Sequence, residues 1–249
     1  MAFGLGGVRD TPDSRDHPYV PPPKILANLP KSVDLTDWLP PVYNQGTINS
    51  CTVNAIAAAI VFDEIKGGAK HVPTPSRLFI YYNERAMEGK ADQETGGQLR
   101  DGNKSVSNQG ACVETLWPYL KANVLVKPPK SCYSRAKKFS LEYQRMMHNL
   151  DHFRACLASG YPFVFGIKVF SSFQGTAVKK TGRVNMPYKG EKSVGLHAVL
   201  AAGYDDKSRR FLVRNSWGRG WGQKGYCSMP YDYLLDSQIS HDFWTIRFK

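Results

Sequence analysis

The apolar residues in the first half of the chain recur at helical spacing. Between Cys51 and Lys66 they fall at steps of three and four residues, and no charged residue occurs before Asp63. Gly67–Gly68 follows, which is typical of a helix end. The pattern predicts a helix over 51–66 that is buried on most sides, and a second, amphipathic helix over 75–87.

The second half of the chain contains the short alternating runs that are typical of strands. Aromatic and β-branched residues alternate over 161–170 and 197–203, and two shorter runs bounded by Gly, Asp and Ser cover 211–214 and 225–229. Helices that precede strands along the chain favour an α+β fold in which the two halves form separate lobes.

Residues 1–30 differ from both halves. They are rich in proline, and the consecutive prolines Pro21–Pro23 hold the chain in an extended conformation that fits neither a helix nor a central strand. We expect an extended amino-terminal leader over 1–30, followed by one folded unit over 31–249.

Composition and charge exclude several classes of protein. No apolar run approaches the roughly 20 residues of a membrane span. The amino terminus lacks the apolar segment of a secretory signal, so we expect a cytoplasmic protein or one released by a non-classical route. The net charge of +12 favours acidic partners without naming one.

A cysteine in the first turn of the predicted buried helix is a candidate nucleophile. Unpaired amides and the helix dipole there favour the thiolate form of Cys51. Gln45 lies upstream on a glycine-containing turn that can bring its amide back toward the sulfur, and such a donor can stabilise an oxyanion. His197 lies in a later strand-like run, and Asn215 follows a short hairpin.

Several short motifs surround these four residues. In chain order they are Pro41-Val42-Tyr43-Asn44-Gln45-Gly46, Ser50-Cys51, Gly96-Gly97, Trp117-Pro118-Tyr119, His197-Ala198-Val199, Gly203-Tyr204, Asn215-Ser216-Trp217-Gly218 and Gly220-Trp221-Gly222. From about residue 29 to the end, the chain resembles the papain family of cysteine peptidases. The resemblance implies a papain-like fold with a mainly helical left lobe over about 41–145, a β-barrel-like right lobe over about 146–243, and the active site in the cleft between them.

The resemblance also implies a role for each residue of the site. Cys51 is the expected nucleophile of a thiol endopeptidase, ionised by its helix terminus and by His197 as imidazolium. Asn215 is expected to orient the His197 ring, and Gln45 with the Cys51 backbone amide to hold the oxyanion. No cofactor and no metal are expected.

Four further residues are implied to meet an extended peptide substrate. Gly96 and Gly97 are expected to line the cleft, where Gly97 offers backbone groups to the substrate in the manner of a strand. Trp217 is expected to shield the bond between His197 and Asn215 from water, and Trp221 to stack beside the primed side of the cleft.

The chain departs from the family pattern next to the nucleophile. Thr52 stands where the family has an aromatic residue, and Ile48 stands where it has a cysteine whose usual partner is missing too. The joint loss of that disulfide fits a reducing compartment. Cys132 resembles another family cysteine, and a bridge between Cys112 and Cys132 stays open as an alternative to two free thiols.

Other functions compete with peptide hydrolysis. Cys–His chemistry with an amide orienter also serves a thiol acyl-transferase or amidase, and an inactive papain-like binding module is a third hypothesis. A nucleic-acid binder rests on net charge alone. The basic pairs Lys179-Lys180 and Arg209-Arg210 are dispersed along the chain, so we interpret them as solvated surface and expect neither nucleic acid nor membrane as a partner.

Two histidines at helical spacing, His148 and His152, raise the possibility of a metal site. No glutamate occupies the position that zinc-protease motifs require, so we interpret both as structural or solvated residues.

The leader is too short for the separately folded proregion with which papain-like enzymes are typically made. Its extended bias instead suits a strap along the cleft, with Leu5, Val8, Tyr19 and Val20 available for apolar subsites. A disordered tail is the alternative. The strap hypothesis predicts a zymogen in which residues 1–30 inhibit the enzyme's own active site.

Overall fold

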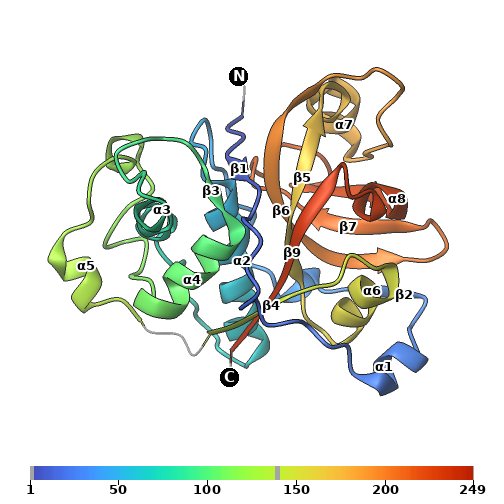
Figure 1. Ribbon diagram of the computed structural model, residues 1–249, viewed down its shortest axis with the longest axis horizontal. Coiled ribbons are helices and arrows are strands. Elements are labelled where there is room, and N and C mark those ends of the chain that lie inside the picture. Colours follow the sequence, from blue (N-terminus) through green and yellow to red (C-terminus); the bar gives the residue numbers. More distant parts are fainter. Residues whose placement is uncertain (1–2, 138–140, 249) are drawn as a thin grey trace.

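The computed structural model describes residues 3–137 and 141–248, which form a helical lobe and a β lobe with the leader running between them (Figure 1). The helices are α1 (Pro23–Ala27), α2 (Cys51–Lys66), α3 (Arg77–Met87), α4 (Leu99–Gln109), α5 (Lys130–Ser134), α6 (Leu150–Ala158), α7 (Thr176–Thr181) and α8 (Tyr231–Leu235), with the 3₁₀ turns η1 (Thr36–Trp38), η2 (Lys121–Asn123) and η3 (Ser171–Gln174). The strands are β1 (Gly7–Val8), β2 (Ser32–Asp34), β3 (Gly97–Gln98), β4 (Leu141–Arg145), β5 (Phe163–Phe170), β6 (Ser193–Asp205), β7 (Arg210–Arg214), β8 (Tyr226–Pro230) and β9 (Ser240–Phe248).

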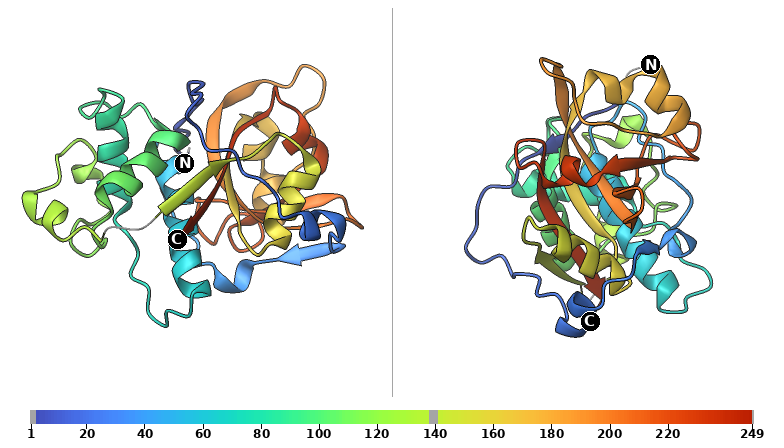
Figure 2. Two further views of the ribbon diagram at one scale, coloured as in Figure 1. Left: turned by 60° about the horizontal axis from the view of Figure 1, so that its bottom comes forward. Right: turned by 90° about the vertical axis from the view of Figure 1, so that its right-hand side faces the viewer.

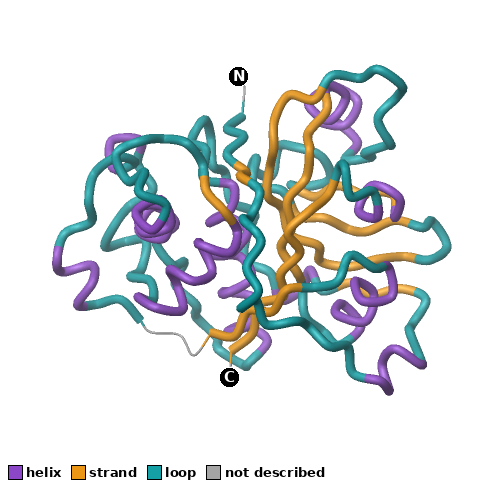
Figure 3. Tube along the Cα trace, in the orientation of Figure 1, coloured by secondary structure: helices purple, strands orange, loops and turns teal. Residues whose placement is uncertain are grey.

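The α+β fold and its two lobes are confirmed. Figure 3 shows a lobe built mainly of helices and loops on one side, and on the other side the large sheet with several short helices around it. The predicted helix over 51–66 is α2, and its first twelve residues, 51–62, are all buried. The predicted strands correspond to β5, β6, β7 and β8.

The β lobe is built on an antiparallel sheet of seven strands. Its order is β4-β9-β5-β6-β7-β8, and β2 pairs with β6 off this path. Among the described strands no pairing joins β4 to β8, so the sheet is open. The β lobe expected from the sequence is therefore present, and its described strands do not close into a barrel. Residues 141–145, which the sequence placed at the end of the helical lobe, form β4 of this sheet.

The two hydrophobic cores meet at β6. Its side chains alternate: Val199 and Ala201 join the aromatic core of the β lobe, whereas Ala198, Leu200 and Ala202 join the core around α2 and α3. This alternation follows from the pleat of a strand. It fixes α2 against one face of the sheet, and with it the candidate nucleophile at the start of the helix.

The leader lies along the boundary between the lobes before it reaches α1. β1 pairs with β3 of the helical lobe, and α1 lies beside the β lobe. In Figure 2 the leader is the dark blue segment, which crosses in front of the β lobe toward α1 in the left view and follows the left edge of the molecule in the right view.

Candidate active site

The start of α2 brings Cys51 to the inner face of β6. Cys51 is the first residue of the helix and is fully buried. The backbone of Ala198, directly after His197 on β6, forms a hydrogen bond with its thiol. The structure thus places the Cys51 thiol against the β6 backbone next to His197, 146 positions away in the sequence.

His197 and Asn215 come from neighbouring strands. β6 pairs with β7, and Asn215 directly follows β7. The His197 Nε2 and Asn215 Oδ1 atoms are 2.8 Å apart. Nδ1 of His197 is buried and has no partner among the described residues, so it is the ring nitrogen left for the thiol and the reacting groups.

Trp217 lies against the ring of His197. Its ring lies 5.0 Å from the His197 ring, centroid to centroid, and the residue is 3% exposed. Trp221 is 1% exposed and meets Trp217 edge-on at 5.4 Å. Trp221 is thus buried and packs against Trp217.

Gln45 is held beside the site by a tight network. Its Oε1 accepts from Ser216 Oγ at 2.6 Å, and its backbone nitrogen donates to the Ser216 carbonyl at 2.9 Å. The side-chain amide is thereby turned, and Nε2 donates to the carbonyls of Ile48 at 2.8 Å and Gly4 at 3.2 Å. Ser216 is a positioning residue that the sequence analysis did not single out.

The leader contacts the chain segments that surround these residues. β1 pairs in parallel with β3, in the register Gly7–Gly97 and Val8–Gln98. The Gly97 amide donates to the Gly6 carbonyl at 3.0 Å. At the other end, the Phe3 ring stacks on Trp217 with centroids 4.6 Å apart and planes 4° from parallel.

Glycine is required at several of these leader positions because the backbone passes very close to both lobes. A Cβ atom on Gly6 would lie 1.8 Å from the Asn49 carbonyl oxygen, and one on Gly7 would lie 2.9 Å from the His197 nitrogen. On the opposite wall, a Cβ atom on Gly96 would lie 2.0 Å from the Gly6 carbonyl oxygen. The paired glycines expected to receive a peptide therefore receive the leader.

Burial under the leader disfavours the charged forms of the catalytic pair. Loss of solvent raises the pKa of the Cys51 thiol to about 11, against the opposing hydrogen bonds from Ala198 and Gly6. It also lowers the pKa of His197 to about 4, although Asn215 favours the charged ring. In the covered site both groups are neutral at pH 7, and the ion pair expected from the sequence is not favoured there.

An ionic cluster fastens the next part of the leader. Asp16 forms ion pairs with Arg100 at 2.6 Å and with Arg145 at 2.9 Å. The Asp10 carboxyl accepts from the Trp244 indole at 2.7 Å, and the Asp10 amide donates to Asp242 at 2.8 Å. The sequence analysis missed this cluster, because its members come from the leader, α4, β4 and β9.

The apolar leader residues divide into two groups. Leu5 packs beside Gly195 near the site, and Val8 lies in β1. Tyr19 instead joins the core of the β lobe, and Val20 is 74% exposed. The expectation that Tyr19 and Val20 fill subsites is wrong, because the leader leaves the boundary between the lobes before it reaches them.

Thr52, the departure beside the nucleophile, has a polar partner. Its hydroxyl donates to Glu84 at 3.0 Å, and both side chains are buried. Burial and the nearby Glu88 raise the pKa of Glu84 well above its usual range. Burial thus favours the protonated form of this carboxyl, which lies behind the first turn of α2 and against Gly97.

The other candidate residues take structural positions. All five cysteines are free, including Cys112 and Cys132, whose thiols are neighbours. His148 lies outside α6, 2.5 Å from the Leu234 carbonyl oxygen. Within residues 3–137 and 141–248, no three His, Cys, Asp or Glu side chains gather in a group that could hold a metal ion. No helix in that part of the chain is long and apolar enough to cross a membrane.

The fold and this arrangement resemble those of the papain family of cysteine proteases. The family model described as "Papain family cysteine protease" matches residues 29–243, and the chain belongs to this family. Xylellain, a cysteine protease from Xylella fastidiosa, has a crystal structure that superposes with a TM-score of 0.92 at 43% identity, over 98% of this chain and 96% of xylellain.

Three further proteins are also similar to this chain. An uncharacterized peptidase C1-like protein of Acanthamoeba polyphaga mimivirus is 40% identical over 99% of this chain and 88% of its own length. Ananain from Ananas comosus is 26% identical over 83% of this chain and 57% of ananain. The structure of a bromelain protease from the same plant, bound to the inhibitor E64, superposes with a TM-score of 0.67 at 23% identity.

Proposed function

We propose that this chain is a cysteine-type endopeptidase that is made latent by its own leader. One observation supports the proposal: the thiol of Cys51 at the start of α2 meets the backbone of Ala198, the residue after His197, whose ring is held by Asn215. The Gln45 amide binds the carbonyl of Gly4, two residues before the leader residue Gly6 whose backbone contacts the same thiol. The four side chains are a nucleophile, a base with its orienting group, and an oxyanion donor, which together suffice for acyl transfer.

In the uncovered site, the Cys51 sulfur attacks the carbonyl carbon of a peptide bond after its proton has passed to His197. The oxygen becomes an oxyanion, which the Gln45 side-chain amide and the Cys51 backbone amide stabilise. The carbon–nitrogen bond then breaks, and His197 gives its proton to the leaving amine. Water, deprotonated by His197, attacks the resulting thioester and releases the carboxylic acid and the thiol.

The direction of the leader explains how it can occupy the site without being cut. Because His197 must protonate the leaving amine, the carboxyl-terminal part of a substrate departs past His197 and Trp217. The leader has its amino-terminal residue Phe3 at Trp217 and therefore runs the opposite way. It offers the Gly4 carbonyl to Gln45 while the Gly6 backbone contacts the sulfur.

A full-length Gly6→Val variant tests the proposal. The added side chain collides with the Asn49 carbonyl, so the leader is expected to leave the site and hydrolysis of internally quenched peptides to appear. The double variant Gly6→Val/Cys51→Ala is expected to be inactive. Mass spectrometry of the products separates hydrolysis from transfer to an added amine, which a thiol acyl-transferase would favour. No turnover of any peptide by Gly6→Val, with the leader shown to be released, would contradict the proposal and favour a binding module.

A further inference from the structure

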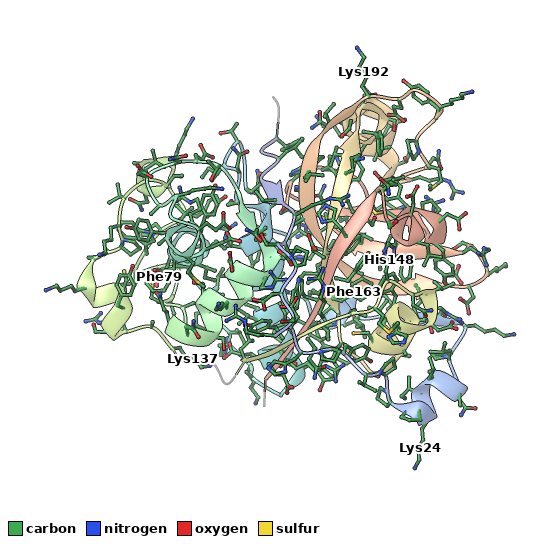
Figure 4. All side chains as sticks on the ribbon, in the orientation of Figure 1. Lys24, Phe79, Lys137, His148, Phe163 and Lys192 are labelled. Carbon is green, nitrogen blue, oxygen red and sulfur yellow. The ribbon has the colours of Figure 1, made fainter. Side chains whose placement is uncertain are left out.

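Seven exposed basic side chains gather at one end of the β lobe. They are Lys179, Lys180, Arg183, Lys189, Lys192, Arg219 and Lys224, and we call them the basic surface. Lys192 projects from this end of the molecule in Figure 4. In the described part of the chain, none of the seven has an ion-pair partner.

The backbone holds these residues together although the sequence spreads them over 46 positions. The Gly222 amide donates to the Lys179 carbonyl at 2.7 Å, which joins α7 to the loop that carries Arg219 and Lys224. The Ser171 amide donates to the Lys192 carbonyl at 3.2 Å, which joins the third segment. The basic pair Lys179-Lys180, which the sequence presented as dispersed, thus lies on a segment joined to those that carry the other basic residues.

Glu191, the acidic residue nearest in sequence to these basic residues, does not neutralise the basic surface. Glu191 is the sole carboxylate within 171–192 and 218–225. It is 9% exposed, and it accepts hydrogen bonds from the Ser171 hydroxyl at 3.0 Å and from the Ser172 amide at 2.6 Å. Its charge is directed inward, into the turn that starts η3. The surface therefore keeps its positive field.

The basic surface begins where the candidate active site ends. Arg219 stands between Trp217, which covers His197, and Trp221. Phe173 of η3 packs against both tryptophans, with ring centroids 5.4 Å away in each case, and leads directly into α7. This is the side past which the leaving amine departs.

The leader provides no acidic partner for the basic surface. Its described residues next to Trp217 and β6, 3–8, contain no carboxylate. Its acidic side chains lie farther along, where Asp16 pairs with Arg100 and Arg145 and Asp13 pairs with Arg15. The positive charge beyond Trp217 is thus available to an external partner.

We propose that the basic surface binds acidic side chains on the carboxyl-terminal side of the scissile bond, so that the enzyme selects protein segments with Asp or Glu clustered downstream of the cleavage site. The inference rests on the proposed function. Exposed lysines and arginines attract an acidic segment from a distance and lose that attraction as salt screens it. An acidic peptide fits better than a nucleic acid because the surface continues the path of the substrate past the catalytic pair.

Cleavage kinetics of the opened full-length enzyme test the proposal. Gly6→Val is assayed with two quenched peptides that share one unprimed half and carry either Asp or Asn at the second to fourth primed positions. At low salt, kcat/KM is expected to favour the Asp peptide by about tenfold, and the preference to vanish in high salt. Adding Lys179→Glu, Lys180→Glu and Arg183→Glu is expected to abolish the preference.

A matched control changes the net charge by the same amount at a different place. Lys121→Glu, Lys127→Glu and Lys130→Glu change three exposed lysines of the helical lobe, and this set is expected to leave the preference unchanged. Equal kcat/KM for the two peptides in the enzyme with an intact basic surface would overturn the inference while leaving the proposed function in place.

A binding measurement on the wild-type full chain does not depend on catalysis. Fluorescence anisotropy with a labelled hexaglutamate peptide is expected to report binding that weakens with salt, that the Lys179→Glu/Lys180→Glu/Arg183→Glu set removes, and that the control set keeps. An absence of binding, or equal loss in both sets, would overturn the inference. So would an oligothymidylate of equal charge that binds through these residues while the peptide does not.

Discussion

The carbonyl oxygen of Gly4 accepts a hydrogen bond from the side-chain amide of Gln45 at 3.2 Å. The leader therefore uses the donor that would stabilise the oxyanion of a reacting peptide. The same segment bonds the Gly97 amide and stacks on Trp217. A substrate and the leader cannot bind these groups at the same time. The leader must therefore move away before a substrate can bind and react.

The first prediction concerns the close packing of Gly6 in the leader against Asn49. Gly6→Val is expected to raise the rate at which iodoacetamide alkylates Cys51 in the full-length protein by at least about tenfold, because the side chain cannot fit beside Asn49. Gly220→Ala is the control, since a Cβ atom there meets no other atom within 4 Å. Equal rates for Gly6→Val and the wild type would show that the leader does not limit access.

The second prediction concerns the ion pairs of Asp16. Asp16→Asn leaves Arg100 and Arg145 without their shared carboxylate in a largely buried position. The loss is expected to weaken leader docking by about 2 kcal/mol, and so to speed alkylation of Cys51 by roughly thirtyfold.

Asp13→Asn provides the matched control for Asp16→Asn. Asp13 pairs with Arg15, which lies in the leader itself, so its loss is not expected to change alkylation. An equal effect of the two substitutions would show that net charge, rather than the pairing with Arg100 and Arg145, holds the leader.

The third prediction concerns pH and Asp10. Burial and the charge of Asp242 raise the pKa of Asp10 from 3.8 to about 7, against the opposing effect of Arg100 and the Trp244 indole. A released leader exposes Asp10 to water, where its pKa returns to the ordinary value. The docked state therefore binds the proton more tightly. The stabilisation of docking by the Asp10 proton is complete below the pKa that Asp10 has in the released leader. It is lost as pH rises through about 7, the pKa of Asp10 in the docked leader.

Docking is thus expected to weaken between pH 5 and pH 8 by more than about tenfold. Hydrogen exchange of the leader amides, corrected for the intrinsic pH dependence of exchange, measures this change. Asp10→Asn cannot titrate and is expected to flatten the profile. Arg100, Arg145, His241 and Asp242 surround the same site and are unchanged in this variant. A wild-type profile as flat as that of Asp10→Asn would contradict the assignment.

The fourth prediction concerns the orientation of His197. Asn215→Ala, in the Gly6→Val background, removes the acceptor that lies 2.8 Å from Nε2. The ring then loses its fixed direction, and kcat is expected to fall by about 10- to 100-fold, which is less than the loss in Cys51→Ala. Stopped-flow turnover and a thermal melt separate this effect from unfolding. Unchanged kcat would mean that Trp217 and β6 alone orient the ring.

The catalytic residues could be predicted from the sequence because each stands in a local pattern. Cys51 begins a helix whose buried apolar spacing is unbroken to Phe62, and His197 lies in a strand with small and branched neighbours. Such patterns depend on near neighbours in the chain, which is why α2 and the strands β5 to β8 were found.

The elements that were missed depend on distant contacts. α4 contains Gly102, Asn103 and Ser105 among few apolar residues, and it is helical because it packs between α3 and β9. β9 pairs with both β4 and β5 and interrupts its alternation with a bulge. No local signal identifies either element.

The position of the leader could be predicted only in outline. Its prolines indicated an extended strap, whereas the glycine spacing that fits it to both lobes depends on Asn49, Gly96 and His197, all far away in sequence. The pKa values of Cys51 and His197 likewise follow from burial between segments that are distant in the sequence, the leader among them. The charge state of the pair was therefore beyond a sequence argument.

The most direct test of the account is the site at which E64 attaches. Wild-type and Gly6→Val full-length proteins are treated with the inhibitor and mapped by peptide mass spectrometry. We predict one adduct on Cys51, formed much faster in Gly6→Val than in the wild type, with Cys112, Cys132, Cys156 and Cys227 unmodified. An adduct on one of those four cysteines, or none on Cys51 in either protein, would contradict the claim that Cys51 is a nucleophile guarded by the leader.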